Sequence, residues 1–179
     1  MRAGIIGIGS YLPEKIVSNT DLEKIVDTTS EWIVERTGIM SRRIAEAHLS
    51  SSDLGAEAAK LAIKDANLQP EDIDMIISAS SSPDCTFPAT ACIIQEKIKA
   101  KSAAAFDIQA ACTGFVYGVT IAAQFIMTGA YKNVLVVGSE VLSKITDWQD
   151  RNTCILFGDG AGAVVVSQVQ SGGIIASYL

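Results

Sequence analysis

The feature that most constrains the fold of this chain is a helix-length stretch, Cys112–Met127, that has almost no polar face. Its apolar side chains fall on every side of the expected helix: Phe115, Val116, Val119, Ile121, Ala122, Phe125 and Ile126. Gly129 follows as a C-terminal stop. A helix that is hydrophobic all round must be covered on all sides. We therefore expect a helix buried between two layers.

Short runs rich in Val, Ile and Ala alternate with helical patterns along the chain. The runs of strand length are Ala3–Ile8, Met75–Ser78, Ala103–Ile108, Val134–Val137, Ala161–Ser167 and Gly172–Ile175. Helical patterns cover 50–67, which starts with good N-cap residues, and Ala89–Ile98. Continuous apolar strands between helices predict an α/β fold with a mostly parallel sheet covered on both faces. Two strands in succession after Val134–Val137 predict an antiparallel edge.

Two shorter features were also interpreted from their residue types. Thr20 with Glu23, and Thr28 with Glu31, have the spacing of capping boxes and predict short helices near the start. The glycine-rich segment 157–163 lacks the spacing of a phosphate-binding loop. We expect a tight turn there, with glycines at positive φ.

The charge balance excludes several classes of function. The chain has 14 basic and 20 acidic residues, a net charge of −6, which argues against general binding to nucleic acid or anionic membranes. An anionic ligand would have to meet a local basic cluster such as Arg36, Arg42 and Arg43.

No signal peptide and no run of about 18 uninterrupted apolar residues is present, so we expect a cytoplasmic protein with no membrane partner.

The four cysteines are expected to be free thiols. No C-x-x-C pair or export signal accompanies them. The one histidine, His48, lies in a polar segment and is expected to be an exposed loop residue. Without a histidine–cysteine set of ligand spacing, the sequence predicts no metal site.

Cys112 is the candidate nucleophile. It follows a predicted strand and two small residues, Ala110 and Ala111, and opens the apolar helix. Unpaired N–H groups and the helix dipole favour a thiolate at a helix N-terminus, which makes the thiol a better nucleophile. From the residues alone an inert cysteine stays open as the alternative, since a buried cysteine more often packs as a small hydrophobe. Cys85, Cys92 and Cys154 lack this placement and are assigned to packing.

The segment D-I-Q-A-A-C-T-G-F-V-Y-G at 107–118 resembles the active-site segment of the type III β-ketoacyl-acyl-carrier-protein synthases. The same resemblance continues in G-I-G-S-Y-L-P-E at 7–14, T-S-E-W-I-V-E-R-T-G-I at 29–39, F-P-A-T-A-C-I-I-Q at 87–95, L-V-V-G-S-E-V-L at 135–142 and D-R-N-T-C-I-L-F-G-D-G-A-G-A at 150–163. It implies a three-layer thiolase-like fold. Residues 1–179 would be the N-terminal half that carries the nucleophile, with a similar C-terminal half absent from this chain.

The resemblance also implies a reaction. Cys112 would accept an acyl group, most often acetyl, from an acyl-coenzyme A, which is a substrate and not a cofactor. Malonyl-acyl carrier protein would then lose carbon dioxide and attack the thioester, and the backbone N–H of Cys112 would supply one oxyanion donor. The histidine and asparagine that form the carbanion belong to the C-terminal half, and His48 is no substitute. We therefore expect no condensation by this polypeptide alone.

By the same resemblance, coenzyme A meets Thr28, Trp32, Arg36 and Arg151. Trp32 and Arg151 would sandwich the adenine, and Arg36 would meet a phosphate. Their residue types also allow other roles, because Thr28 is a good N-cap and Trp32 and Arg36, four residues apart, can simply pack on a helix surface.

Phe87, Leu142 and Phe157 match positions that line the acyl pocket, with Phe87 reaching into the site of a partner subunit. Plain core packing is the alternative for all three. The resemblance implies a homodimer that pairs Ala103–Ile108 with its copy.

Two other functions stay open from the sequence. One is a non-catalytic scaffold module that keeps the fold without turnover. The other is a related condensing enzyme with different starters, such as a polyketide, alkylquinolone or hydroxymethylglutaryl-CoA synthase.

Overall fold

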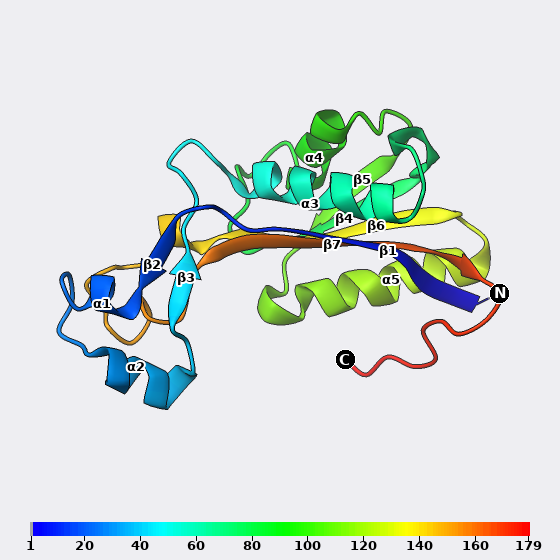
Figure 1. Ribbon diagram of the computed structural model, residues 1–179. Helices are drawn as coiled ribbons and strands as arrows, with labels where there is room; N and C mark the ends of the chain where they lie inside the picture. The colour runs from blue at the N-terminus through cyan, green and yellow to red at the C-terminus, as the bar shows by residue number, and fades with distance from the viewer. Residues whose placement is uncertain (1) are drawn as a thin grey trace.

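A five-stranded sheet forms the middle layer of the computed structural model, which describes residues 2–179 (Figure 1). In spatial order its strands are β1 (Arg2–Tyr11), β7 (Asp159–Val169), β6 (Asn133–Val141), β4 (Met75–Ala79) and β5 (Ala104–Ile108). Helices α3 (Ser51–Asp65) and α4 (Thr90–Ile98) cover one face, and α5 (Gly114–Thr128) covers the other (Figure 1). The expected three layers are confirmed.

The sheet is mixed. Strand β4 is parallel to both β5 and β6, whereas β7 is antiparallel to β6 and to β1. All strands except β7 therefore run in one direction. The expected antiparallel strand exists, but its expected edge position is wrong, because β1 from the start of the chain pairs along the outer side of β7.

The expected last strand, Gly172–Ile175, is also wrong. Gly172 and Gly173 have φ of 70° and 98°, a left-handed conformation that turns the chain away from the extended path of β7. Within residues 2–179, a single backbone hydrogen bond joins this segment to β1, from Ile174 N to Ala3 O at 2.8 Å. Ile174 packs beneath the sheet without joining it.

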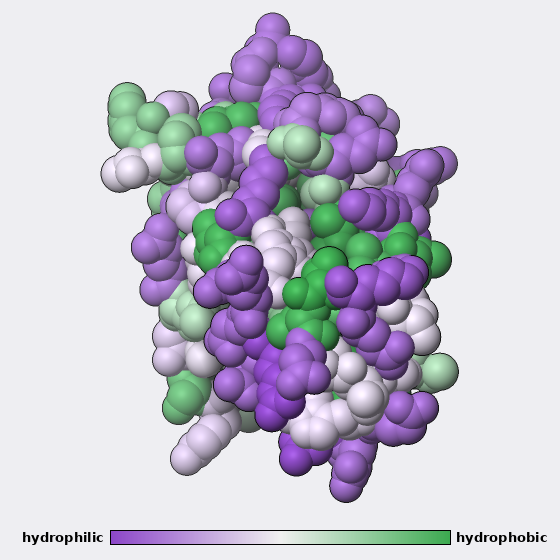
Figure 2. All heavy atoms as spheres, turned by 90° about the vertical axis from the view of Figure 1, so that its left-hand side faces the viewer, coloured by the Kyte–Doolittle hydropathy of each residue, from purple (hydrophilic) through white to green (hydrophobic). Residues whose placement is uncertain are grey.

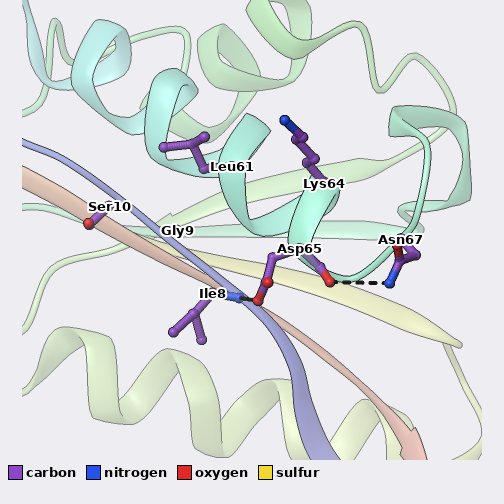
Figure 3. Close-up of a pocket in the computed structure, with 7 residues that line it drawn as sticks. All are labelled: Ile8, Gly9, Ser10, Leu61, Lys64, Asp65 and Asn67. Carbon is purple, nitrogen blue, oxygen red and sulfur yellow. Dashed lines mark hydrogen bonds between the residues drawn. The ribbon is translucent and has the colours of Figure 1, made fainter.

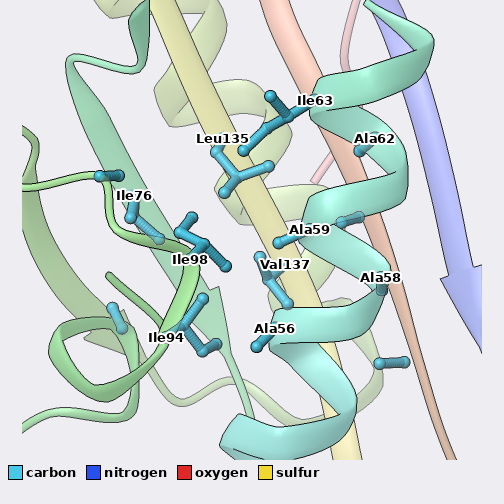
Figure 4. Close-up of a cluster of buried hydrophobic side chains, with 14 of the residues drawn as sticks. Ala56, Ala58, Ala59, Ala62, Ile63, Ile76, Ile94, Ile98, Leu135 and Val137 are labelled. Atoms are coloured by element: carbon cyan, nitrogen blue, oxygen red, sulfur yellow. The ribbon is translucent and has the colours of Figure 1, made fainter. Parts of the chain in front are cut away.

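The larger core lies between the sheet and helices α3 and α4 (Figure 4). Small side chains on α3, among them Ala59 and Ala62, let the helix come close to Leu135 and Val137 of β6. Each fully buried Ile, Leu or Val contributes about 1.5–3 kcal/mol relative to its exposed state. This packing fixes α3 and α4 on the strands that end at the candidate site.

Strand β1 is an edge strand that α3 covers closely (Figure 3). The Ile8 amide donates to Asp65 Oδ2 at 2.9 Å, so a side chain satisfies a donor that has no strand partner. An open hollow of about 690 Å³ beside it is lined by Ser10, Leu61, Lys64 and neighbouring residues, none of which is a predicted site residue.

A small second sheet, β2 (Ile16–Ser18) paired with β3 (Ser41–Arg43), carries α1 (Asn19–Leu22) and α2 (Ser30–Thr37) at one end of the molecule (Figure 1). Both short helices were expected, but both capping assignments are wrong. The cap of α1 is Ser18, whose hydroxyl accepts from Asp21 N at 3.2 Å.

The cap of α2 is Thr29, whose hydroxyl accepts from Trp32 N at 3.1 Å. Glu23, expected to cap the first helix, instead accepts from Ser30 N at 2.6 Å in the first turn of α2. A capping hydroxyl accepts from an N–H two or three residues further along the chain, and several neighbouring hydroxyls here have nearly the right spacing.

The expected basic cluster is divided between structural roles. Arg42 is buried and donates to the carbonyls of Val17 and Ile155 at 3.1 and 3.3 Å and to Asn19 Oδ1 at 2.9 Å. Burial lowers the pKa of Arg42 from its ordinary value. Arg43 donates to the Pro13 and Glu14 carbonyls. Arg42 and Arg43 thus join segments of the small sheet to the body.

The glycine-rich segment 157–163 is not the expected turn. Strand β7 starts at Asp159 within it, and no glycine of this segment has positive φ. Gly158 serves close packing, because an added Cβ would lie 3.0 Å from Arg42 Cβ. Asp159 accepts from the amides of Ala45 and Ser143 at 2.7 and 2.9 Å.

Helix α5 differs from the expectation in its exposure. Its buried residues are Gly114, Gly118, Ala122, Ala123 and Ile126, on the face that meets the sheet. Val116, Tyr117 and Met127 on other faces are exposed. The helix is therefore covered on one side only in residues 2–179.

By length and composition alone, one helical segment, Ala111–Thr128, could cross a membrane. Core helices of soluble proteins meet the same criterion, and this segment packs on the sheet.

Candidate active site

Cys112 lies in a single 3₁₀ turn, η2 (Ala111–Thr113), between the end of β5 and the start of α5. Ala111, immediately before it, has φ of 46°, in the left-handed region that a residue with a Cβ rarely adopts. Such a conformation persists only where the surrounding structure imposes it, and it is frequent at functional sites. The turn places Cys112 at the surface, so its thiol is exposed.

The backbone N–H of Cys112 is not used by the hydrogen bonds of turn η2. Thr113 N donates to Ala110 O at 3.2 Å, and Gly114 N donates to Ala111 O. The Cys112 N–H takes part in neither bond. Cys112 was expected at the start of the apolar helix, and it lies two residues before the first residue of α5.

A pocket of about 420 Å³ opens beside this thiol. It lies at the carboxyl ends of β4 and β6 and at the start of α5, and its lining is mostly apolar: Ala79, Ser81, Ala111, Cys112, Phe115, Gly138, Ser139, Glu140, Leu142 and Phe157. Gly138 leaves room for the Phe115 ring, since an added Cβ would lie 3.1 Å from it. Cys112 is the one nucleophilic sulfur among these residues.

The structure brings two of the three predicted acyl-pocket residues to Cys112. Leu142 and Phe157 line the pocket, whereas Phe87 does not. Phe87 is 89% exposed on the loop before α4. Within one chain, Phe87 therefore has no core-packing role.

Glu140 is a pocket residue that the sequence interpretation missed. Its carboxylate accepts from the Ser81 amide at 2.7 Å and from the Ser82 hydroxyl, so it joins the end of β6 to the loop after β4. Because parallel strands β4 and β6 are neighbours, their carboxyl ends meet at one edge. An acidic residue at the end of an otherwise apolar strand, V-V-G-S-E, was the available signal.

Three of the four predicted coenzyme A residues meet where helix α2 lies beside the loop before β7. The Arg36 guanidinium lies 4.3 Å, and that of Arg151 4.8 Å, from the centroid of the Trp32 ring. Arg151 Nη1 also donates to Asp27 O at 3.2 Å. The fourth residue, Thr28, has a buried hydroxyl that lacks a partner in the described chain.

An open hollow of about 620 Å³ adjoins Arg151 and is bounded by Asp27 and Asp150. Hydrogen bonds from the Asn152 amide and the Thr153 hydroxyl lower the pKa of Asp150. Figure 2 shows the molecule from this end, where the surface is mostly hydrophilic with apolar side chains near its middle.

The remaining sulfur and histidine side chains separate into distinct environments. All four cysteines are free. Cys154 is buried, as expected for packing, whereas Cys85 is exposed and that assignment is wrong for it. His48 is exposed, as predicted. Residues 2–179 contain no group of three or more His, Cys, Asp or Glu side chains that could hold a metal ion.

Comparison with known proteins agrees with this geometry. Residues 106–179, which include Cys112, match the family model described as 3-oxoacyl-[acyl-carrier-protein] synthase III. The chain is 63% identical over 180 residues to the β-ketoacyl-[acyl-carrier-protein] synthase III of Caldanaerobacter subterraneus subsp. tengcongensis, covering 100% of this chain and 54% of that protein. It is 61% identical over 175 residues to the synthase III of Clostridium acetobutylicum, covering 98% and 54%.

Solved structures show the same fold. A 3-oxoacyl-[acyl-carrier-protein] synthase III from Aquifex aeolicus superposes with a TM-score of 0.92 at 54% identity, covering 94% of this chain and 55% of that one. A priming β-ketosynthase from the R1128 polyketide biosynthetic pathway gives 0.93 at 37% identity, covering 95% and 51%. The chain spans about half the length of the curated relatives it matches.

Proposed function

We propose that this chain belongs to the β-ketoacyl-[acyl-carrier-protein] synthase III family, whose curated member it matches over its whole length, and that Cys112 is the nucleophile that accepts an acyl group from acyl-coenzyme A. The observation that carries the proposal is the exposed Cys112 thiol at the start of α5, in an apolar pocket. A thiolate attacks the thioester carbonyl and forms a tetrahedral intermediate, which expels coenzyme A as its thiolate and leaves an acyl-Cys112 thioester.

The Cys112 N–H supports this step as one oxyanion donor. It lies outside the two hydrogen bonds of turn η2, and an N–H at this position is fixed before the substrate arrives. Leu142 and Phe157 give the acyl chain an apolar surface beside the thiol. Phe87, which lies outside the pocket of its own chain, would enter the pocket of a partner subunit.

The complete reaction would need a second half of the fold. We propose that residues 1–179 act as the N-terminal, nucleophile-bearing domain and that a similar C-terminal half supplies the histidine and asparagine that promote decarboxylation of malonyl-acyl carrier protein. The exposed apolar face of α5 supports this, because a helix with so little polar surface needs cover. Residues 1–179 alone would take up an acyl group without condensing it.

Acyl-coenzyme A would bind with its nucleotide at Trp32, Arg36 and Arg151. The three side chains already stack, and two guanidinium groups give a local positive charge in an acidic chain. The proposed reaction uses no cofactor, since acyl-coenzyme A is itself a substrate. A homodimer formed along β5 is part of the proposal, because β5 is an edge strand with half-buried side chains. We place the protein in the cytoplasm.

A polyketide-priming synthase is the second candidate, because the R1128 priming enzyme superposes as well as the synthase III from Aquifex aeolicus does. Both candidates use the same Cys112 chemistry and differ in the acyl group and carrier.

The test is acylation of the chain by acetyl-coenzyme A, with the adduct located by peptide mass spectrometry. We expect a 42 Da acetyl adduct on Cys112 and none in Cys112→Ala, whereas Cys85→Ala, which removes another exposed thiol, keeps it. A chain that stays unmodified at Cys112, or that is modified equally in Cys112→Ala, would overturn the proposal in favour of a non-catalytic scaffold.

A further inference from the structure

The loop that presents Phe87, residues 80–89, has no helix or strand and little apolar support. Cys85, Thr86, Phe87 and Pro88 are all exposed. Within the described chain, no backbone–backbone hydrogen bond joins residues 81–88 to another segment. An exposed aromatic side chain on such a loop would lose its position unless other contacts fixed the backbone.

Carboxylates fix both ends of this loop. At the start, Glu140 accepts from Ser81 N at 2.7 Å, and Ser82 Oγ in turn accepts from Val141 N at 2.8 Å. At the end, Asp107 of β5 accepts from the Thr90 and Ala91 amides at the start of α4, both at 2.7 Å. Only the middle, which carries Phe87, is out of their reach.

Asp84 is the contact that holds the middle. Its Oδ1 accepts from the Ser52 amide at 2.8 Å, and its Oδ2 accepts from the Ser52 and Ser50 hydroxyls at 2.5 and 2.7 Å. The carboxylate therefore sits on the N-terminus of α3, where the helix dipole favours negative charge. Phe87 follows it by three residues.

The partner of Asp84 is itself rigid. Ser52 is 0% exposed and donates to Asp84 while it accepts from Lys97 Nζ at 2.6 Å. Lys97 belongs to α4, the helix into which the loop runs, and also bonds to Asp53 of α3 at 2.5 Å. The loop is thereby tied to two helices at one point.

From these contacts we propose that Asp84 is a positioning residue for acyl-chain selection: it fixes the loop so that Phe87 is presented at one depth to the acyl pocket of a partner subunit. The role rests on the proposed function. Asp84 touches no reacting atom, and its effect passes through the backbone to Phe87. Loss of these bonds would alter which chain lengths fit and leave the Cys112 thiol unaffected.

The test compares acylation of Cys112 by acetyl- and octanoyl-coenzyme A in the dimeric protein, with each rate divided by the rate of iodoacetamide alkylation at Cys112. Asp84→Ala is expected to change the octanoyl-to-acetyl ratio by at least about threefold, in the same direction as Phe87→Ala, since the lost hydrogen bonds each contribute about 1 kcal/mol. Asp84→Asn keeps an acceptor for Ser52 N and should remain within about twofold.

Two further variants separate positioning from stability. Asp84→Glu keeps the charge at α3 but lengthens the side chain, so it should also change the ratio. Asp72→Ala removes another exposed aspartate, which accepts from the Gln69 backbone amide at 2.8 Å and lies outside the loop, so it should not change the ratio. Hydrogen exchange of peptide 80–91 is expected to rise in Asp84→Ala and to return towards normal in Asp84→Asn.

The outcomes separate the two proposals. If the unsubstituted protein is not acylated at Cys112, the proposed function fails and this role fails with it. Two outcomes with normal acylation overturn the positioning role alone. In the first, Phe87→Ala changes the octanoyl-to-acetyl ratio while Asp84→Ala and Asp84→Glu do not. In the second, Phe87→Ala itself leaves the ratio unchanged.

Discussion

The Arg151 guanidinium lies over the Trp32 ring, 4.8 Å from its centroid, with the Arg36 guanidinium 4.3 Å from the same centroid. The slot in which an adenine would stack between Trp32 and Arg151 is therefore closed by the two side chains themselves. A base could enter only if Arg151 moved away from the ring and broke its 3.2 Å hydrogen bond to Asp27 O. Binding of a nucleotide would exchange a cation–π contact for two stacking contacts.

Because this slot is closed, Trp32→Ala and Arg151→Ala should weaken coenzyme A binding to different extents. Trp32→Ala removes the stacking surface and should weaken coenzyme A binding about tenfold or more, since base–aromatic stacking contributes about 1–3 kcal/mol. Arg151→Ala should weaken it less, because the loss of one stacking partner is partly offset by a ring that no longer has to be uncovered. Calorimetric titration with coenzyme A measures both, with the exposed Lys101→Ala as control. Unchanged affinity in Trp32→Ala would contradict the placement of the nucleotide.

The strained residue before the nucleophile gives a second prediction. Ala111 has φ of 46°, which costs an L-residue about 1–2 kcal/mol, and a β-branched side chain tolerates it less. Ala111→Val should lower the free energy of unfolding by more than about 1 kcal/mol and slow iodoacetamide alkylation of Cys112 as the turn relaxes.

Ala111→Gly is the matched control. Glycine adopts this φ without strain but gains entropy in the unfolded chain, so the change in stability should stay within about 1 kcal/mol. Chemical denaturation and the alkylation rate test both variants. Equal stability and equal Cys112 reactivity in Ala111→Val and Ala111→Gly would show that φ at this position is not constrained.

The sequence predicted what depends on local pattern. The strand before Cys112, the turn of small residues and the helix after it follow from hydrophobic periods and residue size, and all three are present. The position of β7 inside the sheet could not be read in this way, because strand order depends on pairing between residues as distant as Gly4 and Ser167.

The contacts of Glu140 and Asp84 were not predicted from the sequence for a related reason. Glu140 and Asp84 act through backbone amides of other segments, and no residue type in the sequence marks which amide a carboxylate will meet. Capping by Thr29 in place of Thr28 turns on a shift of one residue between two threonines. Exposure of α5 could not be predicted because it depends on what covers the helix, which its own residues do not specify.

The contact between β1 and α3 predicts a large difference between two glycines. A Cβ at Gly9 would lie 2.2 Å from Ala58 O and 2.5 Å from Ala62 N, both backbone atoms that cannot move independently. Gly9→Ala should therefore destabilise the protein by about 1–3 kcal/mol or more. At Gly162, in the neighbouring β7, no atom lies within 4 Å of the added Cβ.

Gly162→Ala is the control, and its free energy of unfolding should change by less than about 1 kcal/mol, towards greater stability. Thermal or urea unfolding of the two variants measures the difference. Similar stabilities for Gly9→Ala and Gly162→Ala would contradict the close approach of β1 to α3.

The Asp53–Lys97 pair predicts a pH-dependent contribution to stability. Burial works to raise the pKa of Asp53, but hydrogen bonds from Lys97 and Ser50 outweigh it, so the pKa lies below its ordinary value. A depressed folded-state pKa stabilises the protein above the unfolded pKa of about 3.9, and the stabilisation is lost as pH falls through the folded value. Both side chains are about one-third exposed, at 32% and 33%, so solvent screening keeps the effect small.

Lys97→Met should lower the free energy of unfolding by about 0.5–1 kcal/mol at pH 7, and the difference from the unsubstituted chain should shrink as the pH falls below about 4. Lys60→Met removes a more exposed pair with Glu57 and should cost only a few tenths of a kcal/mol. Urea unfolding of both variants and of the unsubstituted chain, at pH 7 and at acid pH, measures these differences in the free energy of unfolding. A Lys97→Met deficit that is the same at pH 7 and at acid pH would rule out an ionic contribution from Asp53.

The four thiols should react with an alkylating reagent in an order set by their exposure. Cys85 and Cys112 are exposed, Cys92 is half-buried with its sulfur 3.8 Å from Ala105 O, and Cys154 is 0% exposed. Burial, and then the nearby charge of Asp150, raise the pKa of Cys154, so at neutral pH it is neutral as well as inaccessible.

In the folded protein, time-resolved peptide mass spectrometry should find Cys85 and Cys112 modified first and Cys154 only after denaturant is added. Cys85→Ser should leave the Cys112 rate unchanged, because the two thiols react independently. Modification of Cys154 in the native protein at the rate of Cys85 would mean that the segment packed around Arg42 opens in solution.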